Sequence, residues 1–234
     1  MSAIYWREMK SYFFTMSGYV FVASFLCATG LLFTINNLFM LSDSFSNIML
    51  SNCYLMILTV PALTMRLFAE ERWAKTDQIL LCAPVKVSSI VMGKYLSGLS
   101  VLALSLVLSL YFPVLLVLLG NPRASEIFLG YLGCFLLGAS LISVGMFVSS
   151  ITINSLSAAV TTSVTLLFLY IAYSVGSNMA IPQLRDALGF ISPYSYLSLF
   201  RIGILSMKSV VALLSYAAVF IWMTILSIDF RMWR

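Results

Sequence analysis

Residues 93–119 read GKYLSGLSVLALSLVLSLYFPVLLVLL, and Lys94, near their start, is the only charged residue among them. A helix rises about 1.5 Å per residue, so a stretch of this length can cross the ~30 Å hydrocarbon core of a bilayer. Five further long stretches contain no charged residue: 18–41, 48–65, 127–148, 156–175 and 210–228. The sequence therefore predicts an all-α membrane protein with six transmembrane helices.

The composition of the chain excludes other broad classes of protein. Of its 234 residues, 62% are hydrophobic and 9% are charged, whereas a soluble domain is about 45–50% apolar and about 25% charged. Aromatic residues make up 14% of the chain, and disordered segments are poor in them. We therefore expect one multi-pass domain that covers residues 1–234 and lies in a lipid bilayer.

The distribution of Lys and Arg predicts the orientation in the membrane. Eight of the 13 basic residues lie at the two termini or between the second and third stretches, a ninth is Lys94 at the start of the third stretch, and the other four lie in the third and fifth connections. Basic residues are enriched on the cytoplasmic side, so we expect both termini to be cytoplasmic. Residues 66–92 then form the main cytoplasmic loop.

The N-terminal segment, residues 4–16, has the pattern of an amphipathic helix. At about 100° per residue its apolar side chains share an arc of about 120°; they are Tyr5, Trp6, Met9, Tyr12, Phe13 and Met16. Arg7, Lys10 and Ser11 lie opposite. Such a helix is predicted to lie in the membrane interface. The alternative is an irregular lead-in to the first span.

The sequence predicts no catalytic, metal or nucleotide site. The chain has no His, and its four Cys residues are far apart and form no CxxC pair. Its one Gly-Lys dipeptide, Gly93-Lys94, is followed by Tyr95 rather than Ser or Thr, so it is not a phosphate-binding loop. No Asp, Glu, Lys or Arg lies near the middle of a span, whereas ion-coupled transport requires such groups at that depth. We therefore expect no enzyme activity and no cofactor in this chain, and the scattered basic residues indicate no nucleic-acid partner.

The fourth stretch carries small residues at three- and four-residue spacings. They are Gly130, Cys134, Gly138 and Gly145, with Leu141 on the same face. A face of this kind lets helices approach closely. We expect it to pack within the chain, and a seam between two copies is the alternative.

Residues 65–96, between the second and third stretches, contain two predicted short helices. One continues the second stretch through Trp73, and the other covers residues 76–82 and stops before Pro84. An apolar patch, Ile79-Leu80-Leu81, lies between charged residues of this loop. A solvated loop does not need such a patch, so the pattern indicates docking of a soluble partner.

This loop resembles that of the type-2 ABC transporter permeases, in particular the subgroup that includes the gliding-motility permeases. The matching positions are Leu67 to Glu71, Arg72, Thr76, Leu80-Leu81, Ala83-Pro84-Val85, Ile90-Val91 and Gly93-Lys94-Tyr95. The C-terminal part is similar at Ile191-Ser192-Pro193-Tyr194, Phe200 and Gly203. Two positions depart from the family pattern, because Lys75 replaces the usual glycine and Gln78 replaces the usual acidic residue.

The resemblance implies a half-transporter in the bacterial cytoplasmic membrane. Two permease chains, as a homodimer or as a pair with a paralogue, would form the pore, and each would dock on a separate cytosolic ABC ATPase subunit that holds ATP and Mg²⁺. The residues implied in ATPase coupling are Glu70, Glu71, Arg72, Asp77, Gln78 and Lys86. The alternative is that Glu70 and Glu71 only form surface ion pairs with neighbouring basic residues, which contribute about 0–1 kcal/mol.

Residues 177–208 are too polar to span the membrane cleanly, and Pro182, Gly189 and Pro193 separate their apolar clusters. The pattern is typical of a re-entrant pair of short helices before the sixth span. The resemblance implies a lid on the outer exit at this position, in which Arg185 and Asp186 would pair. The alternative is a plain loop outside the cytoplasm.

Together these features predict an ATP-driven exporter permease. Its cargo would be amphipathic or hydrophobic, such as a peptide, a lipid-linked molecule or a drug. The alternative is a non-transporting membrane scaffold that recruits a cytosolic ATPase to a membrane assembly. Cargo-stimulated ATP hydrolysis distinguishes the two, because only a transporter shows it.

Overall fold

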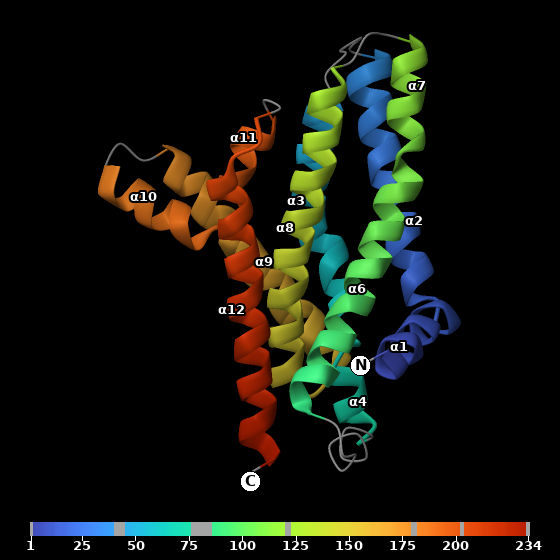
Figure 1. The fold of residues 1–234 in the computed structure, drawn as a ribbon, viewed down its shortest axis with the longest axis vertical. Helices are drawn as coiled ribbons and strands as arrows, with labels where there is room; N and C mark the ends of the chain where they lie inside the picture. Colours follow the sequence, from blue (N-terminus) through green and yellow to red (C-terminus); the bar gives the residue numbers. More distant parts are fainter. Residues whose placement is uncertain are drawn as a thin grey trace.

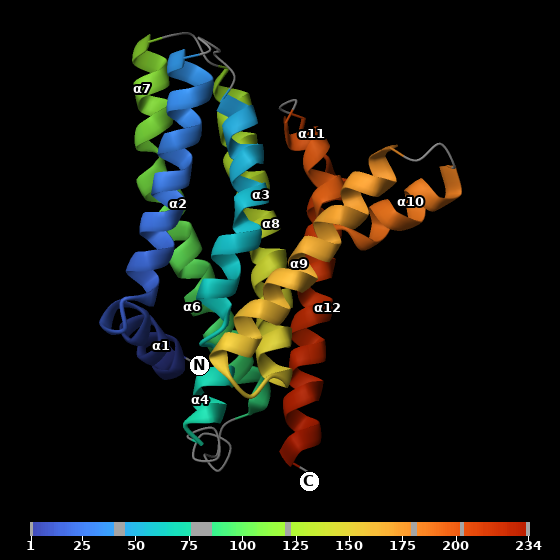
Figure 2. The same cartoon turned by 180° about the vertical axis from the view of Figure 1, so that it is seen from behind.

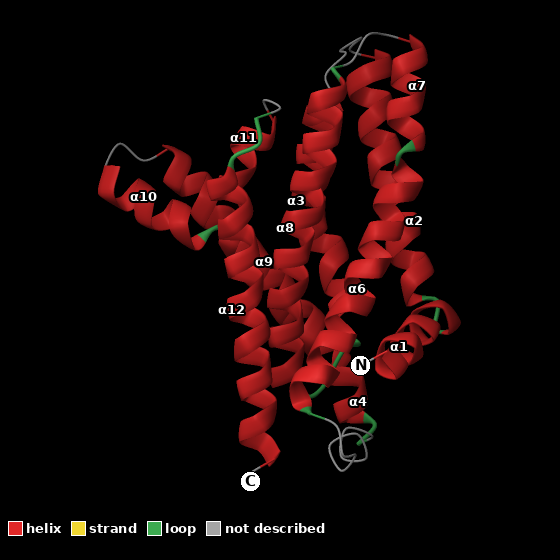
Figure 3. Ribbon diagram, viewed as in Figure 1, coloured by secondary structure: helices red, strands yellow, loops and turns green. Residues whose placement is uncertain are grey.

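The computed structural model describes residues 2–39, 45–75, 86–119, 123–178, 182–201 and 204–232, and every regular element in these ranges is helical (Figure 3). Six helical segments are long and apolar enough to cross a membrane: Ser17–Asn37, Ser51–Trp73, Val87–Leu118, Ala124–Ile151, Ser155–Asn178 and Met207–Phe230. The prediction of six spans is therefore confirmed, and the chain is a multi-pass membrane protein.

The six spans pass up and down through one bundle, so both ends of the chain lie at the same end of it (Figure 1). The short helix α4 (Ala69–Trp73) lies at this end as well, which is named the α4 end below. The helix α7 (Tyr111–Leu119) reaches the opposite end, named the α7 end. The cytoplasmic location of the α4 end stays a prediction from the basic residues.

The helix α8 (Ala124–Ile151) is the centre of the bundle. It packs most extensively against four other helices: α3 (Phe45–Thr64), α6 (Val87–Ser109), α9 (Ser155–Asn178) and α12 (Met207–Met232). The first span, α2 (Ser17–Phe33), continues as the π-helical segment η1 (Thr34–Phe39) and packs on α3 and α6. Every residue from 137 to 146 of α8 is buried, as expected for a helix enclosed by its neighbours.

The small residues of α8 allow this close packing. A methyl group added at Gly138 would lie 2.7 Å from the side chain of Leu102 in α6. One added at Gly145 would lie 2.9 Å from the Cβ atom of Thr64 in α3. The predicted small-residue face therefore packs within the chain, where helix backbones approach each other.

The third span extends beyond the apolar stretch 93–119 and is not one continuous helix. It begins earlier, at Val87, and is divided at Leu110 into α6 and α7. Pro113 has no N–H group to donate to the carbonyl of Ser109, and its ring crowds that carbonyl. The division therefore has a local cause in the sequence.

The N-terminal helix α1 (Ser2–Phe14) is separate from the first span, as predicted. Met16 ends it with a left-handed backbone (φ 60°), and α1 turns across the α4 end, where it packs on α6 and α2 (Figures 1 and 2). Trp6 and Phe14 are exposed, whereas Tyr12 is buried and donates to the carbonyl of Leu63 at 3.2 Å. The predicted apolar arc is therefore shared between the outer surface and the protein core.

Residues 182–201 are helical rather than an irregular loop. They form α10 (Pro182–Ile191), the 3₁₀ turn η2 (Pro193–Leu197) and α11 (Ser198–Arg201). The helix α10 packs back along α9, and the pair projects from the side of the bundle (Figures 1 and 2). Tyr194 and Phe200 are buried, and Phe200 packs against Gly133 of α8. The core therefore anchors η2 and α11, while α10 lies outside it.

Candidate functional site

The junction between the second span and α4 is attached to the end of α8. The hydroxyl oxygen of Ser149 accepts hydrogen bonds from the backbone N–H groups of Phe68 and Ala69, both at 3.2 Å. These N–H groups lie at the start of α4, where a helix has no acceptors of its own. The side chain of Arg72 donates to the carbonyls of Ile151 and Thr152 at 2.7 and 3.1 Å. These contacts attach both the start and the end of α4 to the end of α8.

Lys94, in the second turn of α6, is completely buried in this junction. Its ammonium group donates to the carbonyl of Leu67 at 2.6 Å and lies 2.9 Å from Glu71 Oε2 and 3.2 Å from Glu8 Oε1. The ring of Phe68 lies 5.1 Å away, within the range of a cation–π contact. An ammonium group has three N–H donors, and each has an acceptor here. Lys94 therefore joins α1, α4 and α6.

Arg7 completes a network of four charged side chains. It donates to Glu8 at 2.6 Å and to Glu71 at 2.7 Å, so each carboxylate contacts both Arg7 and Lys94. Burial by itself lowers the pKa of Arg7, but the hydrogen bond and charge of Glu8, aided by Glu71, outweigh it, and the pKa is raised. Arg7, Glu8, Glu71 and Lys94 are called the Lys94 network below. With two cations and two carboxylates, the network has no net charge.

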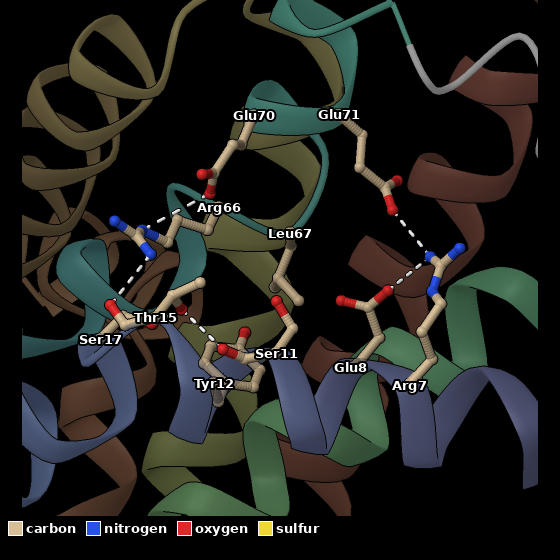
Figure 4. Close-up of a pocket in the computed structure, with 10 residues that line it drawn as sticks. All are labelled: Arg7, Glu8, Ser11, Tyr12, Thr15, Ser17, Arg66, Leu67, Glu70 and Glu71. Atoms are coloured by element: carbon tan, nitrogen blue, oxygen red, sulfur yellow. Dashed lines mark hydrogen bonds and ion pairs between the residues drawn. The ribbon is translucent and has the colours of Figure 1, made fainter.

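A pocket of about 220 Å³ lies beside the network, between α1 and α4 (Figure 4). Glu70 extends into it and pairs with Arg66 at 3.5 Å, and the Arg66 side chain also reaches the carbonyl of Thr15 at 3.4 Å. Glu70 is half-exposed, so this pair is screened by water and contributes little, about 0–1 kcal/mol. Figure 4 shows Glu70 and Glu71 both directed from α4 toward α1.

The structure places four of the six predicted coupling residues. Glu71 belongs to the Lys94 network, Glu70 pairs with Arg66, and Arg72 holds the end of α8. Lys86 is exposed at the start of α6. Asp77 and Gln78, like the predicted helix over 76–82, lie outside the described residues.

The alternative of simple surface pairs fits only one of the two glutamates. Glu70 forms such a pair, with a residue one helical turn before it. Glu71 instead contacts a buried ammonium group 23 positions further along the chain, and Arg7 from the N-terminal helix. The role of both glutamates in coupling stays a prediction.

Sequence reasoning did not predict the Lys94 network. In the sequence, Lys94 indicates only membrane orientation and a resemblance of the loop, and Arg7 lies on the polar face of the predicted interfacial helix. One signal was present in the sequence. Lys94 is the only charged residue within the six apolar stretches, and a charge in such a place is expected to have a specific partner.

The backbone after α4 bears on one departure from the family pattern. Lys75 has φ 55°, in the left-handed region that favours glycine. Its N–H group bonds the carbonyl of Arg72 at 3.1 Å, so it closes the short helix as a C-terminal cap. This is the position at which the type-2 permeases usually have glycine. The backbone at Lys75 is therefore of the kind that glycine adopts without strain.

The predicted outer element lies toward the α7 end, away from the Lys94 network (Figure 1). Pro182 begins α10, and Pro193 begins η2 and is buried. Arg185 and Asp186 are both exposed on α10. The predicted ion pair between them is absent from the described structure, because neighbouring residues on a helix do not face each other.

Neither a metal-binding cluster nor a match to a known family helps to identify the function of this site. Within the described ranges, no three His, Cys, Asp or Glu side chains are grouped so that they would hold a metal ion. No protein-family model matches the chain, and no curated protein matches it. The function is therefore inferred from the residues of the junction and from the pattern of the loop.

Proposed function

We propose that this chain is the membrane-spanning subunit of an ATP-driven ABC exporter. It would pair with a second permease chain and with two separate ATPase subunits, which bind ATP and Mg²⁺, in the bacterial cytoplasmic membrane. The cargo would be an amphipathic or hydrophobic molecule. The observation that carries the proposal is that polar contacts attach α4 to three other helices. They join it to α1 through Arg7, to α6 through Lys94, and to α8 through Arg72.

A coupling element must transmit force from a partner to the spans. Movement of α4 would act on α6 through Glu71 and Lys94, on α1 through Arg7, and on α8 through Arg72. Short charged contacts of this kind resist separation more strongly than neutral hydrogen bonds. The tip of α4 remains available for a partner, because Trp73 is 71% exposed and Lys75 is exposed beside it.

Two further features support the proposal. The exposed Trp6 and Phe14 on α1 suit a helix in the membrane interface, where aromatic side chains concentrate. The helices α10 and α11 suit a re-entrant element before the sixth span, since η2 and α11 are held by the protein core. We infer that this element lies at the outer exit of the pore.

The first test is to purify the chain from its native host in mild detergent and to identify the bound proteins by mass spectrometry. The exporter proposal expects a cytosolic ATPase with a phosphate-binding loop in stoichiometric amount. In proteoliposomes, this complex should hydrolyse ATP faster when its cargo is present. Recovery of the chain alone would contradict the proposal. An ATPase partner whose hydrolysis no cargo stimulates would favour the scaffold instead.

Replacement of Trp73 tests whether α4 is the docking surface. Trp73→Ala should reduce recovery of the ATPase by about 10-fold, because exposed tryptophans often carry much of the free energy of an interface. It leaves the Lys94 network intact, unlike a change of Glu71. The matched control is Trp222→Ala, which removes a similarly exposed tryptophan from α12. Equal recovery of the ATPase by the two variants would remove α4 from the interface.

A further inference from the structure

A cleft of about 880 Å³ opens between α9, α10, η2 and the start of α12, on the side of the bundle opposite to α7. In Figures 1 and 2 these elements form the lateral projection and its junction with the bundle. The volume lies within the range of about 300–1,000 Å³ that is typical of small-molecule sites. The Lys94 network has no residue in the lining of this cleft.

The cleft is lined by hydrogen-bond donors that have no partner in the described part of the chain. Arg185 and Lys208 both line it, and neither forms an ion pair or a side-chain hydrogen bond there. Ser209 also lines it and is only 3% exposed, yet its hydroxyl has no partner in the described structure. By contrast, Ser215 in the same helix donates to the carbonyl of Ala212 at 2.9 Å. The hydroxyl oxygen is open to the cleft rather than sealed within the protein, so it is free to donate to a ligand there.

The charges of the lining favour an anion. Arg185 and Lys208 outnumber the one carboxylate of the lining, Asp186, so the net charge is positive. Lys208 and Ser209 lie in the first turn of α12, a helix of 26 residues. The N–H groups of a first turn are without intrahelical acceptors, and the helix dipole adds positive potential at that point. Guanidinium, ammonium, hydroxyl and backbone N–H groups are the donors that recognise phosphate.

The rest of the lining favours an amphiphile over a small inorganic ion. Phe190 and Val211 are largely exposed at the cleft, and Tyr173 and Tyr196 are half-buried in its wall. The outer face of α12 continues from Val211 to Leu214, which is also exposed. In a membrane-spanning helix this face is available to acyl chains. A ligand with one phosphate and one apolar tail would satisfy both parts of the cleft.

We propose that this cleft binds the phosphate headgroup of a membrane amphiphile. Arg185 and Lys208 contact the phosphate oxygens, the hydroxyl of Ser209 donates to one of them, and the apolar tail lies along α12. Asp186 accepts any amine that the headgroup carries. The site lies within this chain alone, so the proposal does not depend on whether an ATPase drives transport.

The test measures binding of three probes to the detergent-purified chain. Dioctanoyl phosphatidic acid carries both parts of the ligand, dioctanoylglycerol has the same tails without phosphate, and inorganic phosphate has no tail. We expect the first to bind at least about 10-fold more tightly than either of the others, since charge-assisted hydrogen bonds add to the apolar contact.

Variants assign this binding to the cleft. The double variant Arg185→Gln with Lys208→Gln should weaken binding of dioctanoyl phosphatidic acid by about 10-fold or more, and Ser209→Ala by about threefold, because each removes a donor to phosphate. Arg185 and Lys208 are exposed and unpaired, so the double variant should fold with an unchanged melting temperature. The matched control is Arg123→Gln, which removes another exposed cation at the α7 end.

Three outcomes would overturn the proposal. Equal binding of dioctanoylglycerol would reduce the cleft to an apolar groove. Inorganic phosphate that binds as tightly as the lipid would make the ligand a soluble anion instead. A double variant that binds like the Arg123→Gln control would place the lipid elsewhere on the chain.

Discussion

Replacement of Lys94 by methionine tests whether the Lys94 network stabilises the fold. The change keeps an unbranched side chain but removes the ammonium group, so the carbonyl of Leu67 and the carboxylates of Glu8 and Glu71 lose a donor. Removing one partner of a buried ion pair costs about 3–5 kcal/mol. Arg7 still contacts both carboxylates at 2.6 and 2.7 Å, and this offsets part of the loss. We therefore expect Lys94→Met to lower the free energy of unfolding by about 2–4 kcal/mol.

The assay is reversible denaturation in mixed lipid–detergent micelles, with the free energy of unfolding obtained by linear extrapolation. The matched control is Lys86→Met, eight positions earlier, where the lysine is exposed at the start of the same helix. A change at such a surface position is usually within about 0.5 kcal/mol. A double-mutant cycle with Glu71→Gln measures the coupling between the two side chains, for which we expect about 1–3 kcal/mol.

Two results would refute the reasoning. If Lys94→Met were no less stable than Lys86→Met, the buried ammonium group would contribute no net stability, and its desolvation would cancel its ion pairs. If the effects of Lys94→Met and Glu71→Gln were simply additive, the 2.9 Å contact between the two side chains would carry no coupling energy. In either case α4 would not be joined to α6 strongly enough to transmit force.

Two further predictions concern the packing of α8. Gly145→Ala should destabilise the fold by about 1–3 kcal/mol through overpacking against Thr64. Adding Thr64→Ala should restore most of this stability. Gly189→Ala is the control, because its added methyl would meet nothing closer than 4.0 Å and should cause no overpacking. Ser149→Ala should cost about 1–2 kcal/mol, because two N–H groups at the start of α4 lose their acceptor; Ser215→Ala, which removes only a bond within its own helix, should cost less. Thermal unfolding in the same micelles measures all five variants, and a Gly145→Ala chain as stable as Gly189→Ala would contradict the packing argument.

The spans were predictable from sequence because their cause is local. A backbone in lipid must satisfy its hydrogen bonds within its own segment, so uncharged stretches of sufficient length become helices wherever they pack. The break at Leu110 has a local cause as well, in the missing N–H group of Pro113. The helical character of residues 182–201 was also indicated by their apolar clusters between prolines.

The candidate site was only half predictable. The resemblance of the loop to the type-2 permeases selected Glu70, Glu71 and Arg72, and their role in coupling stays a prediction. The partners of these side chains depend on contacts that no local pattern describes. Lys94 meets Glu8 across 86 positions of the chain, and Arg72 meets Ile151 across 79.

The class of protein, the number of spans and the segments that connect them follow from local sequence, because hydropathy, length and helix-breaking residues act over a few turns. Which charges meet, and which donors stay free, depends on how distant helices pack. The turn at Met16 brings α1 back to α6 and so buries Lys94 among carboxylates. The return of α10 along α9 leaves Arg185 and Lys208 beside one cleft. Both arrangements arise from helices that pack together although they are distant in the chain, and the energy of such contacts exists only once the chain has folded.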